Sequence, residues 1–149
     1  MRAVLQRVSR AKVTVGSELA GEIGKGIVVL LGVAVGDSEV DARYLVEKII
    51  NLRIFDDEDG KMNLSLADVE AGLLVISQFT LYSDTRKGRR PSFVRVANPS
   101  QANALYEFFI AEARSHISTV ETGRFQAMMD LELVNDGPVT ILIDSERKF

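Results

Sequence analysis

Two continuous apolar runs in the chain predict strands that are buried on both faces. The first covers residues 27–35, and the second covers residues 72–81 and ends in polar groups around Ser77 and Thr80. Such runs are typical of strands that have protein packed against both faces, whereas half-exposed strands alternate apolar and polar residues. We therefore expect these two segments at the centre of a sheet.

Alternating and β-branched segments predict further strands around this centre. The expected ranges are 2–15, 18–23, 53–55, 61–64, 120–125, 128–134 and 139–143. Some of these strands follow each other through short turns, and others are separated by a helical segment. Together they predict a single-domain α/β fold with a mixed sheet that curls into an open barrel.

Two segments with apolar residues three and four positions apart predict the helices. The first begins with a sequence that resembles a capping box at Ser38 and Asp41, and it ends near Leu52. The second begins after a cap at Asn98 or Ser100 and ends near His116. The expected core-facing residues are Ala42, Leu45, Ile49 and Leu52 in the first helix, and Ala102, Leu105, Phe109 and Ala113 in the second.

Composition restricts the location and chemistry of the protein. The 149 residues include no cysteine, which excludes disulfides, thiol nucleophiles and cysteine-based zinc sites. No apolar run reaches the ~18 residues typical of a membrane span, and the first residues lack the apolar region of a signal peptide. We therefore expect a cytoplasmic protein without a membrane partner.

Charge is unevenly distributed along the chain, although the net charge is only −3. Residues 56–59 are all acidic, and a basic loop carries Arg86, Lys87, Arg89 and Arg90. The net charge does not favour general binding to DNA, so a nucleic-acid partner requires a local patch such as this loop. The loop suits a polyphosphate or an RNA end, and its alternative role is that of a solvated surface segment.

Few side chains offer acid–base or metal chemistry. His116 is the only histidine, and its place near a helix end favours a surface or capping role. Without paired histidines or cysteines, we expect no metal site. Thr80 has a hydroxyl but no visible base to activate it as a nucleophile. The backbone N–H groups of Phe79 and Thr80 could instead form an oxyanion hole at the strand end.

Residues 135–140 lie between the last two predicted strands and contain Gly137 and Pro138. Proline cannot donate a hydrogen bond to a strand neighbour, and glycine adopts backbone angles closed to other residues. The segment is therefore either an ordinary hairpin turn or a rigid backbone feature that faces a ligand.

The two segments around Thr80 and Pro138 together resemble the D-aminoacyl-tRNA deacylase family, also called D-tyrosyl-tRNA deacylases. The resemblance covers the whole chain. Its motifs are Leu5-Gln6-Arg7-Val8, Arg53-Ile54-Phe55, Gly60-Lys61-Met62-Asn63-Leu64, Ser77-Gln78-Phe79-Thr80-Leu81, Arg90-Pro91-Ser92-Phe93, Thr122-Gly123-Arg124-Phe125 and Asn135-Asp136-Gly137-Pro138-Val139-Thr140.

The resemblance implies an esterase that releases D-amino acids, and also glycine, from the 3′ end of tRNA without a metal or other cofactor. It implies a homodimer with active sites at the subunit interface. The Gly137–Pro138 bond would be cis, with its carbonyls in the partner's pocket, where they exclude L-amino acids. Ser77 would line the opposite wall.

In the implied mechanism, the vicinal ribose hydroxyl assists the attacking water, backbone groups of Phe79 and Thr80 hold the oxyanion, and Gln78 places the ester. Two alternatives remain open at this point. One makes Thr80 a covalent nucleophile. The other is a non-catalytic RNA-binding module that uses the basic loop at residues 86–90.

Overall fold

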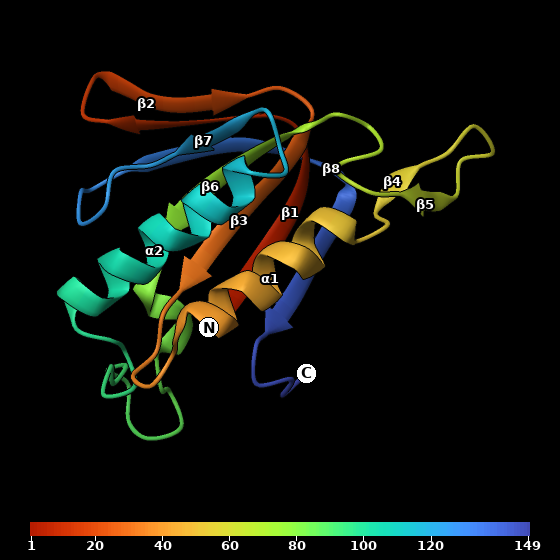
Figure 1. Cartoon of the computed structure of the whole chain (residues 1–149). Coiled ribbons are helices and arrows are strands. Elements are labelled where there is room, and N and C mark those ends of the chain that lie inside the picture. The colour runs from red at the N-terminus through yellow and green to blue at the C-terminus, as the bar shows by residue number, and fades with distance from the viewer.

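The computed structural model describes residues 1–149 and shows a curled mixed sheet with two helices packed on one of its faces (Figure 1). The elements are β1 (Arg2–Val15), β2 (Glu18–Ile23), β3 (Gly26–Gly32), α1 (Glu39–Asn51), β4 (Phe55–Asp56), β5 (Met62–Leu64), β6 (Gly72–Ser77), the 3₁₀ helix η1 (Phe79–Tyr82), α2 (Pro99–Arg114), β7 (Val120–Thr122) and β8 (Asp130–Asp144).

The sheet has the order β2-β1-β3-β6-β7, and β8 pairs with β1. Strands β3, β6 and β7 run parallel, whereas β1 is antiparallel to β2, β3 and β8. The first half of the long strand β1 pairs with β3 and its second half pairs with β2. The sheet curls so that β2 approaches β7. The fold class is therefore as predicted, a mixed α/β sheet in an open, barrel-like form.

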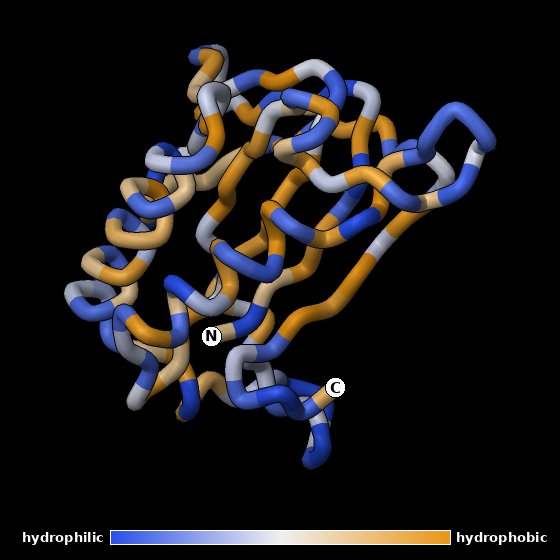
Figure 2. Tube along the Cα trace, turned by 45° about the vertical axis from the view of Figure 1, so that its right-hand side comes forward, coloured by the Kyte–Doolittle hydropathy of each residue, from blue (hydrophilic) through white to orange (hydrophobic).

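The core consists of two clusters on opposite faces of the central strands. Ile27 and Val29 of β3 belong to the larger cluster, which contains the buried faces of α1 and α2. Val28 and Leu74 belong to a smaller cluster, where β1 and β2 curl over the other face. Both faces of β3 and β6 are thus buried. Figure 2 shows hydrophobic segments running through the middle of the molecule.

Both helices begin as the sequence predicts. The Ser38 side chain and the Asp41 carboxylate form the expected capping box at the start of α1. At α2, Asn98 Oδ1 accepts a hydrogen bond from the backbone N–H of Gln101 at 2.9 Å. Neither helix is long and apolar enough to cross a membrane.

The predicted strand over residues 72–81 is too long. Strand β6 ends at Ser77, and the chain then turns into η1. Its neighbour β3 ends at Gly32, so no partner strand continues beyond the hydrogen bond from Gln78 N to Leu31 O, 2.8 Å long. The ring of Tyr82 is buried beneath the Arg2 guanidinium, which lies 4.7 Å from the ring centroid and anchors the turn.

A hairpin turn at residues 135–140 is also contradicted. The predicted strands at 128–134 and 139–143 are two halves of β8, and both pair with the same side of β1. Thr140 lies opposite Gln6, but Asn135 already lies opposite Val8. More residues of β8 than of β1 lie between these two pairs, so the segment around Gly137 and Pro138 bulges from one continuous strand.

Candidate active site

The start of η1 offers two unoccupied backbone donors. Phe79 and Thr80 are its first residues, and the first N–H groups of a helix have no acceptor within it. Neither N–H donates to another group of the protein. Two adjacent free N–H groups suit the negative oxygen of a tetrahedral intermediate. A strand end was predicted to supply these donors, whereas the structure supplies them from a helix start.

The Thr80 side chain lies beside the amide of Gln78. Gln78 Nε2 donates a short hydrogen bond to Thr80 Oγ1, and no carboxylate or imidazole bonds this hydroxyl. An amide cannot take up the proton of a nucleophilic hydroxyl. The arrangement therefore orients Thr80 without activating it.

The basic loop closes next to η1. Backbone hydrogen bonds join Asp84 to Ser92 in both directions, at 2.8 Å and 3.0 Å. Arg86 is tied back inside the loop, since its Nη2 lies 2.6 Å from Asp84 Oδ2. Hydrogen bonds from the side chain and the backbone N–H of Arg86 hold the pKa of the Asp84 carboxyl below its usual range. The other three predicted RNA contacts, Lys87, Arg89 and Arg90, are exposed and form no ion pair.

The Gly137–Pro138 peptide bond is cis, as the resemblance implied. Gly137 has a φ of +130°, which favours glycine. Asn135 braces the bulge, because its Oδ1 accepts from Val139 N at 2.7 Å while its Nδ2 donates to Thr140 Oγ1 at 3.1 Å. The bulge is therefore held from both of its ends.

Arg7 supports the same bulge from beneath and was not singled out in the sequence. It is 6% exposed. Its Nε donates to Asp136 O at 2.9 Å, and its Nη1 donates to Ile54 O at 2.7 Å. Asp56 lies 3.3 Å from Nη1 and partly balances the charge. The sequence placed Arg7 only within the motif Leu5-Gln6-Arg7-Val8, and nothing in that motif indicated its contacts with the bulge.

A single chain does not bring the two predicted halves of the site together. Arg2 Nη1 donates to Leu81 O at 3.2 Å, so η1 lies at the beginning of β1. The Gly137–Pro138 bulge lies over Arg7. An extended strand rises about 3.3 Å per residue, so these positions along β1 are separated by roughly 17 Å.

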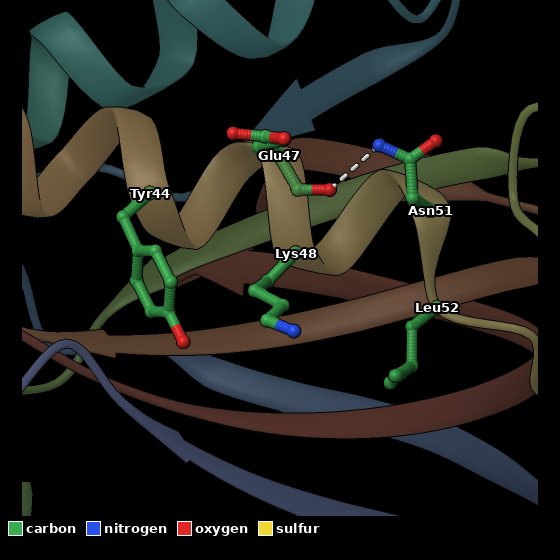
Figure 3. Close-up of a pocket in the computed structure, with 5 residues that line it drawn as sticks. All are labelled: Tyr44, Glu47, Lys48, Asn51 and Leu52. Atoms are coloured by element: carbon green, nitrogen blue, oxygen red, sulfur yellow. Dashed lines mark hydrogen bonds between the residues drawn. The ribbon is translucent and has the colours of Figure 1, made fainter. Parts of the chain in front are cut away.

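Two surface hollows lie away from these segments. One of about 320 Å³ is lined by Tyr44, Glu47, Lys48, Asn51 and Leu52 along α1 (Figure 3). There Asn51 Nδ2 donates to the Glu47 carbonyl at 2.8 Å, which closes the helix end. A second hollow lies between the helices and includes His116, which is 3.8 Å from Glu112 Oε1. Neither contains a nucleophile paired with a base.

Comparisons with known proteins give consistent matches. The family model described as D-Tyr-tRNA(Tyr) deacylase matches residues 4–144. A D-aminoacyl-tRNA deacylase of Symbiobacterium thermophilum is 59% identical over 100% of this chain and 99% of its own length. One of Thermus aquaticus is 60% identical, with 99% of this chain and 97% of its own length covered.

Two solved structures share the fold. One, titled c-Myc DNA Unwinding Element Binding Protein, is 41% identical, with a TM-score of 0.92 and coverage of 97% of this chain and 98% of its own. The other is titled as a probable eukaryotic D-amino acid tRNA deacylase. It is 19% identical and covers 95% of this chain and 97% of its own, with a TM-score of 0.83, and therefore supports the fold alone.

Proposed function

Because this chain belongs to the D-aminoacyl-tRNA deacylase family and is a hydrolase of the aminoacyl-tRNA ester bond, we propose that it edits chirality. Its substrates are tRNA carrying a D-amino acid and tRNA-Ala mischarged with glycine. The products are the free amino acid and tRNA. We place this reaction in the cytoplasm, where charged tRNA is used.

The observation that carries this proposal is the pair of free N–H groups at Phe79 and Thr80. As water attacks the ester carbonyl, the carbonyl oxygen becomes negative. Hydrogen bonds from two donors that are already oriented stabilise this charge. The aminoacyl ester is activated, and the neighbouring ribose hydroxyl assists the water. This substrate-assisted route agrees with the absence of a base at Thr80 and needs no cofactor.

Chiral selection is assigned to Gly137 and Pro138 of a second subunit. Arg2, which contacts η1, and Arg7, which contacts the bulge, are roughly 17 Å apart along β1, and this separation supports a site completed by a partner in a homodimer. Rigid backbone carbonyls accept hydrogen bonds from the substrate ammonium group and leave no room for an L side chain. Ser77 lines the opposite wall. Glycine has no side chain to exclude, which accounts for its hydrolysis.

The decisive experiment measures amino acid release from tRNA charged with D-tyrosine, L-tyrosine or glycine, with and without a chelator. We expect rapid release of D-tyrosine and glycine, little release of L-tyrosine and no effect of the chelator. Equal release of both enantiomers would refute the filter, and inhibition by the chelator would refute the cofactor-free route.

A non-catalytic nucleic-acid-binding role is the second candidate. The exposed cations Lys87, Arg89 and Arg90 favour it, and the 41% identical solved relative is named for binding a DNA element. Binding of tRNA without release of any D-amino acid would support this role in place of editing.

A further inference from the structure

Two aromatic rings lie exposed beside the candidate site. Phe79 and Phe93 are 53% and 39% exposed, and their ring centroids are 5.2 Å apart at an interplanar angle of 66°. They pack edge to face against each other, and the adjoining Val94 is 80% exposed. We call Phe79 and Phe93 the aromatic pair. It presents a preformed apolar surface that no other part of the chain covers.

The aromatic pair lies next to two features that could bind an RNA end, the free N–H groups of η1 and the basic loop. Phe79 belongs to the start of η1, where its own N–H and that of Thr80 are free. Phe93 directly follows Ser92, whose backbone pairs with Asp84 to close the basic loop. The contact between the two rings therefore links the start of η1 to the end of the basic loop.

An RNA strand that places its ester at Thr80 and its phosphates at the basic loop must cross these rings. We propose that the aromatic pair stacks with the base of the nucleotide that precedes the terminal, ester-bearing nucleoside. This subsite rests on the proposed function and extends it from the ester to the unpaired 3′ end of the tRNA.

Stacking explains why the aromatic pair lies next to cations. Proteins that bind single-stranded nucleic acids combine aromatic platforms with a basic surface along the backbone, and stacking tolerates every base. Lys87, Arg89 and Arg90 have no carboxylate partner and are available to phosphates. An enzyme that accepts many tRNAs gains affinity from the shared 3′ end in this way.

The test compares a long and a short substrate. D-tyrosyl-tRNA contains the preceding nucleotide, whereas D-tyrosyl-adenosine has the same ester without it. We expect Phe93→Leu to raise the KM for D-tyrosyl-tRNA by about tenfold, with no change in kcat or in the rate on D-tyrosyl-adenosine. Phe93→Tyr should behave like the wild type. Phe108→Leu, at a half-buried ring on α2, is the matched control and should leave both substrates unaffected.

Three results would overturn the subsite. Equal loss on both substrates would indicate a structural role for Phe93, and an unchanged KM for both would show that the ring does not contact RNA. A change in oligomeric state for Phe93→Leu, measured by sedimentation, would assign the ring to a contact between copies of the chain.

Fluorescence tests the subsite independently of catalysis. The chain contains no tryptophan, so Phe93→Trp introduces a single reporter. We expect the trinucleotide CCA to quench it and adenosine not to, while Lys48→Trp on α1 responds to neither. Quenching by CCA without deacylation by the wild type would support the subsite and refute only the proposed function. No quenching would refute the subsite even if deacylation is normal.

Discussion

The Arg7 guanidinium donates from Nε to the carbonyl oxygen of Asp136 at 2.9 Å, directly before Gly137. Its Nη1 also donates to the Ile54 carbonyl at 2.7 Å. One buried cation thus joins the bulge of β8 to the segment that leads into β4. We infer that the position of the bulge depends on the planar fork of this side chain, since a single ammonium group cannot reproduce both directions.

We predict that Arg7→Lys lowers both stability and chiral selectivity. Loss of one hydrogen bond from a charged group costs about 1.5–3 kcal/mol, and the free energy of unfolding should fall by the same amount. The ratio of kcat/KM for D- over L-tyrosyl-tRNA should fall as the bulge loosens. Urea unfolding and deacylation assays measure the two effects. Arg10→Lys, at an exposed position of β1, is the control, and unchanged selectivity in Arg7→Lys would contradict the role.

Gly137→Ala should impair deacylation of D-tyrosyl-tRNA more than a comparable glycine substitution elsewhere. At Gly137 an added Cβ would lie 2.9 Å from Val139 Cγ2 and 3.0 Å from Arg7 Nη2, on a backbone with a φ of +130°. Such conformations cost non-glycine residues about 1–3 kcal/mol, and the bulge would shift to relieve the contacts. We expect release from D-tyrosyl-tRNA to drop at least about tenfold, which corresponds to 1.4 kcal/mol.

Gly60→Ala provides the comparison for Gly137→Ala. Gly60 has a φ of +73° and nothing within 4 Å of an added Cβ. This variant should lose some stability and keep its activity and selectivity. The contrary result is the same loss of deacylation rate in both variants for a given loss in the free energy of unfolding. In that case the bulge would have no special part in the reaction.

The sequence predicted element types well because periodicity and caps are local signals. Ser38 and Asp41 formed the predicted capping box, and the apolar run after Gly26 became a central strand, although β3 ends at Gly32 and not at residue 35 as predicted. The path around Phe79 was missed because β6 ends where β3 runs out at Gly32 and Tyr82 packs under Arg2. Such tertiary contacts leave no periodic trace.

The site was predicted less completely for the same reason. Glycine followed by proline indicated a special backbone, but a turn and a bulge share this signal, and only pairing with β1 separates them. The role of Arg7 depends on two carbonyls from distant segments. Asp84 likewise neutralises the charge of Arg86 through a contact that composition does not show.

The cations of the basic loop should contribute unequally to tRNA binding. Arg89→Ala and Arg90→Ala each remove an unpaired cation, so the slope of log K against log salt should fall by about 0.7–0.9 for each lost phosphate contact. Arg86→Ala should change the slope less, because Asp84 already neutralises Arg86. Binding titrations with uncharged tRNA at several salt concentrations measure these slopes. Equal slopes for all three variants would contradict the unequal roles.

The Asp84 carboxyl should titrate at lower pH than an ordinary aspartate, whose pKa is about 3.9. Hydrogen bonds from the Arg86 side chain and backbone lower its pKa in the folded state. A lowered folded pKa means that the stabilisation is present above the unfolded pKa and is lost as pH falls through the folded pKa. NMR titration of the carboxyl carbon should show this shift, and Arg86→Met should largely remove it. An ordinary pKa in the wild type would show that the ion pair does not persist in solution.

Substitution of Thr80 separates the two candidate mechanisms. The Thr80 hydroxyl accepts from Gln78 and contacts no base, so we expect Thr80→Val to retain most of the deacylation rate, with a loss below about tenfold in kcat. The backbone N–H of the valine still points to the oxyanion. A covalent nucleophile gives a different result, because its removal abolishes the acyl-enzyme route and costs several orders of magnitude. Single-turnover kinetics and a search for an acyl-enzyme by mass spectrometry complete the test. A trapped acyl-Thr80, or loss of activity in a folded Thr80→Val protein, would overturn the substrate-assisted mechanism.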